Sequence, residues 1–167
     1  MYILREANSL DDFDAFLALK SQKDAIKWSG FVTAPDPERF KQYYIEKILN
    51  NPKTHVLFLC DADEKDCPIV AYTQYDDVSP IEIEIRGTVI KRQYQGTDAY
   101  GELSRLTMEH HIHKGHKIFV TWASENNIAS VVNMLKEGYI QTDIFDVRNL
   151  PLLGGEHRFF KFIKEIR

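Results

Sequence analysis

The sequence predicts an α/β protein (α+β in some schemes) with a mixed sheet of about seven strands and helices on both faces. Segments of alternating hydrophobicity and segments of helical spacing follow one another in the order β-α-α-β-β-β-α-β-α-β-β. The strand–helix–strand succession in the second half requires a parallel crossover, whereas a hairpin in the first half is antiparallel. Both kinds of pairing therefore meet in one sheet.

The first half is expected to hold one strand, two helices and a hairpin. Ser9 offers a cap for the first helix, and Pro37 lies in the first turn of the second. An acidic turn separates the two hairpin strands. In chain order, the predicted elements are a strand over 2–7, a helix over 10–23, a loop over 28–31, a helix over 36–50, and strands over 55–60 and 69–75.

The second half alternates strands with helices. Gly115 and Gly138 each end a helical pattern. The predicted elements are a long strand over 81–90, a helix over 101–113, a strand over 117–122, a helix over 127–137, and strands over 139–147 and 157–163. We find no repeat and no linker, so residues 1–167 are expected to form one domain.

Composition and charge narrow the class of function. Hydrophobic residues make up 44% of the chain and charged residues 28%, which is typical of a globular protein. The 21 Lys and Arg against 25 Asp and Glu give a net charge of −4, which disfavours nucleic acid and anionic membranes as partners. Neither a signal peptide nor a membrane-spanning run is recognisable, so a cytoplasmic protein is expected.

The two cysteines, Cys60 and Cys67, flank the acidic turn. They could face each other across the hairpin as a redox pair. The alternative, which we favour, is two unrelated reduced thiols, because so few cysteines form neither a disulfide framework nor a zinc ribbon.

The long strand over 81–90 carries the first candidate site. Isoleucines at 81, 83 and 85 alternate with Glu82, Glu84 and Arg86, so one face is core and the other is charged. Such a face requires either a solvated edge strand or a wet cleft. Gly87 interrupts the alternation, which indicates a β-bulge with backbone groups free for a ligand.

Two helix starts extend this site. The turn from Tyr94 to Gly101 joins the long strand to a helix, and the helix N-terminus there would favour an anion. The turn matches neither the P-loop nor the dinucleotide fingerprint, and the alternative is a plain helix start capped by Thr97 or Asp98. Asn127 opens the next helix at the carboxyl end of the neighbouring strand, where open α/β sheets bind ligands.

The stretch from Ile90 to Tyr139 resembles the core of the GNAT N-acetyltransferase superfamily. The family pattern is V-x-P-x-Y-R-G-x-G-x-G, a helix ending in Gly, a strand, N-x-x-A and Gly-Phe. Ile90, Tyr94-Gln95-Gly96, Gly115, Asn127 with Ser130, and Gly138-Tyr139 take the corresponding positions. The order of elements is similar over the whole chain.

The resemblance implies a transferase that moves acetyl from acetyl-CoA, its co-substrate, to a small-molecule amine or a peptide or protein amine, without a metal. Glu84 takes the position of the general base, with Glu82 as the alternate. The loop over 28–31 is expected to line the acceptor pocket or to bury its aromatic residues. The implied cofactor-binding residues are Val89, Ile90, Lys91, Gln95, Gly96, Thr97, Asp98, Ala99, Tyr100, Gly101, Asn127 and Ser130.

Three positions depart from the family pattern. Asp98 and Tyr100 replace glycines where the pyrophosphate would lie, and Met134 replaces the Tyr that protonates the departing thiolate in many members. A non-catalytic acyl-CoA-binding or regulatory domain is therefore the alternative function. Whether one chain or two form the active unit is left open.

Four histidines gather at the end of the helix over 101–113 and just beyond it. A metal-responsive protein is a third hypothesis, but only Glu109 could complete a ligand set, and we favour a solvated helix end. The histidines are His110, His111, His113 and His116.

Overall fold

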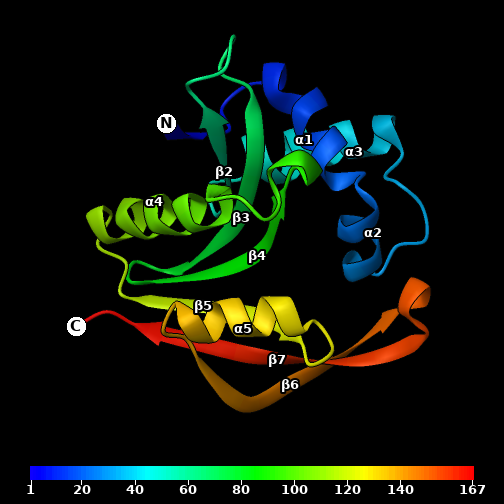
Figure 1. Cartoon of the computed structure of the whole chain (residues 1–167), viewed down its shortest axis with the longest axis vertical. Coiled ribbons are helices and arrows are strands. Elements are labelled where there is room, and N and C mark those ends of the chain that lie inside the picture. The colour runs from blue at the N-terminus through cyan, green and yellow to red at the C-terminus, as the bar shows by residue number, and fades with distance from the viewer.

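One seven-stranded sheet runs through the protein, in the strand order β1-β2-β3-β4-β5-β7-β6 (Figure 1). The computed structural model describes residues 1–167. Only β4 and β5 pair in parallel; every other neighbouring pair is antiparallel, so the predicted mixed sheet is confirmed. The strands are β1 (Tyr2–Glu6), β2 (Thr54–Asp61), β3 (Ile69–Ser79), β4 (Glu82–Ile90), β5 (Ile118–Ser124), β6 (Ile140–Leu150) and β7 (Gly155–Glu165).

Five α-helices cover the sheet. They are α1 (Phe13–Lys20), α2 (Lys23–Ser29), α3 (Pro37–Tyr44), α4 (Ala99–His113) and α5 (Ile128–Lys136). Short turns of helix flank them: η1 (Leu10–Asp12), η2 (Ile45–Leu49), η3 (Arg92–Tyr94) and η4 (Pro151–Leu153). None of the helices has the length and hydrophobicity needed to span a bilayer.

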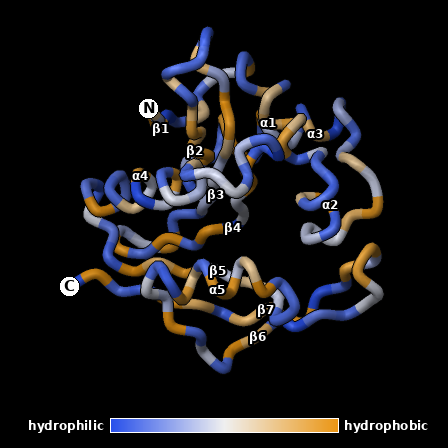
Figure 2. Tube along the Cα trace, viewed as in Figure 1, coloured by the Kyte–Doolittle hydropathy of each residue, from blue (hydrophilic) through white to orange (hydrophobic).

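The two faces of the sheet have separate cores, because successive strand residues point to opposite faces. Val56 and Phe58 of β2 pack with α1 and α3, whereas Leu57 and Leu59 lie in the clusters that include α4 and α5. Figure 1 shows α4 and α5 in front of the sheet and α1, α2 and α3 gathered at its upper right. Figure 2 shows the hydrophobic residues concentrated along the strands and a hydrophilic tip on the β2–β3 turn.

The first predicted helix, over 10–23, ends early: η1 and α1 cover residues 10–20, and a helix that was not predicted, α2, starts at Lys23. Between them lies Gln22, whose backbone is extended (φ −64°, ψ 143°) and whose side-chain amide binds the far end of β4. The predicted loop over 28–31 is also partly wrong, since Trp28 and Ser29 belong to α2 and the loop begins at Gly30. A contact from a distant strand overrides the local helical spacing here.

The cysteines are both free thiols. Cys60 pairs with Ile69 across the hairpin, so Cys67 lies in the turn and not opposite Cys60. Both side chains belong to the apolar cluster beneath α1, Cys60 within it and Cys67 against it. The prediction that the two residues face each other across the hairpin is therefore wrong.

The long strand is interior to the sheet, so the interpretation as a solvated edge is wrong. Ile81 precedes β4 and is exposed, whereas Ile83 is buried as expected. The bulge is confirmed: Gly87 lies opposite Gln74 and Ile85 opposite Tyr75, which leaves Arg86 as an extra residue in β4.

The parallel pairing of β4 with β5 stops just before this bulge. It runs from Glu82 with Ile118 to Glu84 with Val120, although β5 continues to Ser124. Beyond Glu84 the two neighbouring strands part, and the sheet opens at its centre.

Candidate active site

A cleft of about 1150 Å³ lies where β4 and β5 part. It passes from one face of the sheet to the other, because helices of both layers line it. We call the part lined by α1, α2, α3 and β6 the α2 side, and the part lined by α4 and α5 the α4/α5 side. The α2 side includes Lys20, Trp28, Tyr43, Lys47 and Arg148; the α4/α5 side includes Tyr100, Ser104, Thr107, Ser130, Met134 and Glu137.

The turn before α4 forms the rim of the α4/α5 side. Gly96 adopts a left-handed backbone (φ +76°), and no atom lies within 4 Å of where its Cβ would be. Thr97 caps the helix, since its Oγ1 accepts a hydrogen bond from the Ala99 N–H at 3.2 Å. The N–H groups of the next residues have no acceptor within the helix, so they and the helix dipole favour an anion at this rim.

Asp98 does not face the cleft. Its carboxylate accepts a 3.3 Å hydrogen bond from the hydroxyl of Tyr2 on β1, and it caps no helix N–H. The sequence suggested a negative charge where a phosphate would lie, but this side chain is turned to the opposite side of the turn. Asp98 is therefore not among the groups that line the cleft beside Gly96.

The predicted cofactor residues divide into two groups. Those that line the cleft are Val89, Ile90, Gln95, Gly96, Tyr100, Asn127 and Ser130. Lys91, Thr97, Asp98, Ala99 and Gly101 are not part of the lining. Ala99 is fully buried against the core beneath α4, which explains why it cannot reach the cleft. The Oδ1 of Asn127 accepts a 3.3 Å hydrogen bond from the Ser130 N–H, so this pair both caps α5 and lines the cleft.

Of the three residues expected to bind the cofactor at the end of β4, only Ile90 turns its backbone groups to the cleft. The N–H of Lys91 donates to the carbonyl of Val70 on β3 at 2.8 Å. Since successive residues of a strand point their N–H and C=O to opposite sides, Val89 also faces β3, and Ile90 faces the cleft. The backbone N–H of Lys91 is therefore not free for a ligand, because the extra residue at the bulge sets the phase of the strand beyond it.

Gln22 closes the exposed end of β4. Its Nε2 donates to the carbonyl of Ile90 at 2.9 Å, and its Oε1 accepts from the Arg92 N–H at 2.8 Å. The amide thus pairs with β4 as a neighbouring strand would. Gln95 adds a second hydrogen bond to the same carbonyl at 3.1 Å and binds Asp24 of α2 at 2.9 Å.

Glu84 lies at the point where the strands part. Its Oε1 accepts a 2.6 Å hydrogen bond from the indole Nε1 of Trp122, and its Oε2 lies 3.5 Å from the guanidinium of Arg86. The side chain is 19% exposed; its two partners, Trp122 and Arg86, line the cleft, whereas Glu84 itself is not among the lining residues. Glu82 is paired in the closed part of the ladder with Ile118 and lies outside the cleft.

Two tyrosines line the cleft together with Met134. Tyr100 and Tyr139 both line the cleft, and Met134 packs against the cluster that contains Tyr139. Burial, and to a lesser degree the nearby Glu137, raises the pKa of both phenols well above the usual value. Both hydroxyls are therefore protonated at neutral pH and able to donate hydrogen bonds.

The α2 side is bridged at its outer end. Gly30, with φ +82°, ends α2, and a Cβ at this position would lie 2.9 Å from the carbonyl oxygen of Asn149 on β6. The end of α2 therefore touches the end of β6, and only a glycine permits this approach. The two segments are far apart in sequence and meet across the cleft.

Sequence reasoning missed Gln22, Trp122 and Arg148. Each acts through a partner on another element, and none belongs to a local motif. The only usable signal was for Trp122, an aromatic residue near the carboxyl end of a strand whose neighbour was expected to hold the base.

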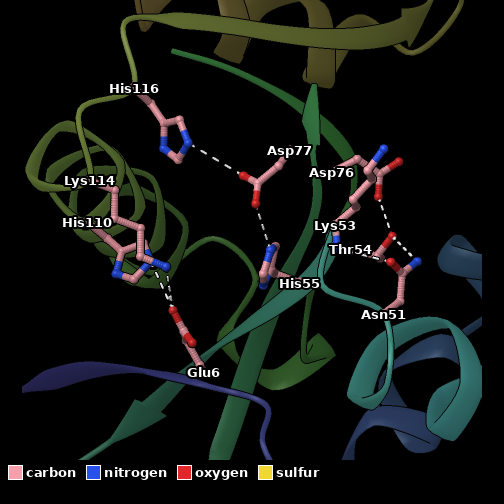
Figure 3. Close-up of polar contacts among 10 residues, drawn as sticks. All are labelled: Glu6, Asn51, Lys53, Thr54, His55, Asp76, Asp77, His110, Lys114 and His116. Carbon is pink, nitrogen blue, oxygen red and sulfur yellow. Dashed lines mark hydrogen bonds and ion pairs between the residues drawn. The ribbon is translucent and has the colours of Figure 1, made fainter. Parts of the chain in front are cut away.

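The histidine cluster is a solvated helix end only at His113, which is exposed, whereas His110 and His116 lie beside carboxylates of β1 and β3 (Figure 3). The contacts of the cluster are His55 Nε2–Asp77 Oδ2 at 2.9 Å, His116 Nε2–Asp77 Oδ1 at 3.5 Å, His110 Nε2–Glu6 Oε1 at 3.3 Å and Lys114 Nζ–Glu6 Oε1 at 2.8 Å. Burial lowers the pKa of His110 and His116, so Lys114 is the cation that pairs with Glu6 at neutral pH. His111 is fully buried, and burial lowers its pKa to about 3, so it is neutral. The structure holds no group of three or more ligating side chains placed to bind a metal ion.

No family model matches the sequence, and a search of curated proteins finds no relative. Solved structures match at low identity along almost the whole chain. The spermidine N-acetyltransferase from Vibrio cholerae, in complex with CoA and spermine, has a TM-score of 0.83 at 10% identity, over 98% of this chain and 95% of that chain. The ribosomal-protein-alanine N-acetyltransferase from Brucella melitensis has a TM-score of 0.74 at 17% identity, over 98% and 99%.

A third structure, from Salmonella typhimurium with its cofactor acetyl-CoA, has a TM-score of 0.72 at 15% identity, over 99% of this chain and 94% of that chain. These likenesses establish the fold. The chain has the GNAT N-acetyltransferase fold, as the resemblance over Ile90 to Tyr139 predicted.

Proposed function

We propose that this protein is an N-acetyltransferase that moves acetyl from acetyl-CoA to a primary amine by direct attack. The observation that carries the proposal is the parting of β4 and β5 beyond Glu84, which opens a cleft through the sheet. Such a cleft lets a thioester enter from the α4/α5 side and an amine from the α2 side. The two substrates then meet beside the bulge in β4.

The α4/α5 side suits the acetyl-CoA molecule. Its pyrophosphate would lie beside Gly96 at the start of α4, where free N–H groups and the helix dipole favour negative charge. Asn127 and Ser130 would line the opposite wall. Two of the structurally similar proteins were solved with CoA or acetyl-CoA, which supports this assignment.

The amine must lose a proton, because a free amine with a pKa near about 10 is mostly protonated at neutral pH. Glu84 is the proposed acceptor of that proton. Trp122 and Arg86 orient its carboxylate, and since Glu84 itself does not line the cleft, the proton would pass through a water molecule.

Negative charge develops on the thioester oxygen as the amine attacks. A backbone N–H directed at that oxygen stabilises the transition state. The N–H of Ile90, which faces the cleft, fits this role better than those of Val89 or Lys91. A thiol with a pKa of about 8.5 leaves readily as thiolate. Met134 has no proton to donate, and Tyr139 and Tyr100, which line the same cleft, are the candidates for protonating that thiolate.

A non-catalytic acyl-CoA-binding domain is the second candidate. Two observations favour it: Met134 lines the cleft without a proton to donate, and the carboxylate of Glu84 is engaged by Trp122 and Arg86. A binding domain needs the α4/α5 side alone. The charged groups of the α2 side would then have no role.

Calorimetry with acetyl-CoA and a CoA-release assay with a panel of primary amines separate these functions. Binding together with amine-dependent release of CoA, and an acetylated product by mass spectrometry, is the result expected for the transferase. Binding without release for any amine supports the binding domain. Absence of acetyl-CoA binding by the folded protein contradicts both.

A further inference from the structure

On the α2 side of the cleft, the carboxylates have hydrogen-bond partners, whereas two of the cations do not. Two carboxylates line this side, and both have donors: Asp76 accepts hydrogen bonds from Arg86 at 2.8 Å and from Thr54 at 2.7 Å, and Asp24 accepts one from Gln95 at 2.9 Å (Figure 3 shows Asp76 and Thr54). Glu84, next to this side, is held by Trp122 and Arg86. The cations Lys20 and Arg148 have no comparable partner. The charge left over for a ligand on this side is positive.

The guanidinium of Arg148 packs against aromatic rings that line the cleft. Its guanidinium carbon lies 4.5 Å from the centre of the Phe159 ring and 5.7 Å from that of Trp122. The only carboxylate near it is that of Asp146, at 3.5 Å and 57% exposed, which is a weak surface contact. A guanidinium packed on aromatic rings keeps its N–H donors free, and their fork matches a carboxylate or a similar oxoacid.

Lys20 is a second unpaired cation on the same side. Its Nζ lies 5.1 Å from the centre of the Tyr72 ring and 5.6 Å from that of Phe16, and no carboxylate is within ion-pair distance. Burial lowers the pKa of Lys20 to about 8, which reflects the cost of a charge removed from water without a partner. An anion bound nearby would offset that cost.

The shape of this side favours a small ligand. The end of α2 at Gly30 touches β6 at Asn149, so the cleft is bridged there and not open as a groove along its length. A protein terminus would have to displace this contact. A small molecule would not.

Trp122 connects the two ends of the site. Its indole N–H binds Glu84, and its ring lies beside Arg148. A ligand that spans the indole would therefore place one end near the proposed base and the other near the free guanidinium.

We propose that the acceptor is a small amine that also carries an anionic oxoacid group, an amino acid or a close analogue. Arg148 binds the oxoacid, and the amine lies at the Glu84 end of Trp122. This inference rests on the proposed function and names its substrate class. Glu84 takes one proton from the ammonium group, which leaves the amine neutral. Attack of the neutral amine forms the amide C–N bond, the thioester C–S bond breaks to release CoA as thiolate, and the second proton of the nitrogen neutralises that thiolate.

The test uses the standard amino acids and their C-terminal amides, which differ only in the carboxylate. Binding to the protein–CoA complex is measured by calorimetry, and kcat/KM by CoA release. At least one amino acid should bind, and its amide should bind about 10- to 100-fold more weakly. Arg148→Met should weaken the amino acid by a similar factor and leave the amide unchanged.

Two further variants sharpen the result. Lys47→Met removes an exposed cation that lines the same side, and it should change the preference for the acid over the amide by less than about threefold. Arg148→Lys keeps the charge without the planar fork, so it should recover part of the binding. Thermal melts establish that each variant is folded.

The outcomes separate the two proposals. Transfer to polyamines or to amino-acid amides at least as efficient as to amino acids overturns the inference and leaves the transferase intact. Equal loss of acid and amide binding in Arg148→Met also overturns it. Absence of transfer to any amine, with amino acids still bound through Arg148, contradicts the transferase and not the ligand class.

Discussion

The indole Nε1 of Trp122 donates a 2.6 Å hydrogen bond to Oε1 of Glu84, joining β5 to β4 where the two strands part. The main-chain ladder ends at this level with Glu84 opposite Val120. The side-chain hydrogen bond between Trp122 and Glu84 therefore connects β4 and β5 at the point where their backbone hydrogen bonds end. It fixes the orientation of the carboxylate and gives one wall to the cleft.

Replacing Glu84 with Gln should lower turnover by about 10²–10⁴-fold, the usual contribution of a general base. The amide keeps the size of the side chain and an oxygen for the Trp122 N–H, but it takes up no proton. Affinity for acetyl-CoA, measured by calorimetry, should stay the same. Raising the pH should partly restore the rate, because more of the amine is then neutral.

Glu82→Gln is the matched control for Glu84→Gln. Glu82 lies on the same strand but outside the cleft, so its substitution should leave turnover close to that of the parent. Parent-like rates for both variants near neutral pH would falsify the assignment of Glu84 as base. The proton would then leave through water alone.

Gly96→Val should weaken the binding of acetyl-CoA by about tenfold or more, since a β-branched residue resists a φ of +76° and the turn must change shape. Gly115→Val is the matched control. Gly115 also has a positive φ of +91° and open space around it, but it follows the far end of α4.

Both glycine variants should lose about 1–2 kcal/mol of unfolding free energy from backbone strain, as measured by denaturant titration. Only the variant at residue 96 should lose acetyl-CoA affinity. If calorimetry gives the same affinity for the two, acetyl-CoA does not use the turn before α4.

Gly30→Ala should destabilise the protein and open the α2 side. The new Cβ would lie 2.9 Å from the backbone oxygen of Asn149, and the residue has a positive φ of +82°. We expect a loss of about 2 kcal/mol or more and a higher KM for the acceptor, because α2 must move away from β6.

Gly154→Ala is the control that separates the two effects expected in Gly30→Ala, the backbone strain of a positive φ and the steric clash with Asn149. Gly154 has a similar φ of +87° and nothing within 4 Å of its Cβ position. The Gly154→Ala variant should lose only about 1 kcal/mol of unfolding free energy and keep the KM of the parent for the acceptor. A Gly30→Ala variant as stable as Gly154→Ala would contradict the contact between α2 and β6.

His111 should make the protein less stable in acid. The unfolded chain protonates this histidine near its ordinary pKa of 6.5, whereas burial holds the folded-state pKa at about 3. Below pH 6.5 the unfolded state binds more protons, so the unfolding free energy falls by up to about 1.4 kcal/mol per pH unit from this group. The part of the unfolding free energy that depends on neutral His111 is fully present above pH 6.5 and is lost as the pH falls toward 3.

His111→Phe keeps a ring against Tyr75 and Phe119 and removes the titration. The fall in unfolding free energy between pH 7 and pH 5 should be smaller in this variant, while the lowered pKa values of His110 and His116 leave part of it. His113→Phe, at an exposed position of the same helix, is the control. An unchanged pH profile in His111→Phe would rule out this source of acid sensitivity.

Much of the α4/α5 side could be predicted because it depends on neighbours in sequence. The break at Gly87 in the alternation of apolar and charged residues predicted a bulge, and the turn through Gly96 predicted the start of a helix at the rim of a cleft. The direction of the Asp98 side chain could not be predicted, because it depends on Tyr2, a residue of β1. The phase of β4 after the bulge was likewise visible only in its hydrogen bonds with β3.

The sequence by itself determined the order of elements, the parallel crossover between β4 and β5, and the position of Glu84 on a charged strand face, because hydrophobic periodicity and glycine positions act over short distances. The tertiary structure alone decided the break at Gln22, the bond from Trp122 to Glu84 and the placement of Arg148 on Phe159. Each of these joins elements far apart in the chain. The geometry of these contacts depends on how the strands pack together, which cannot be predicted from a local sequence pattern.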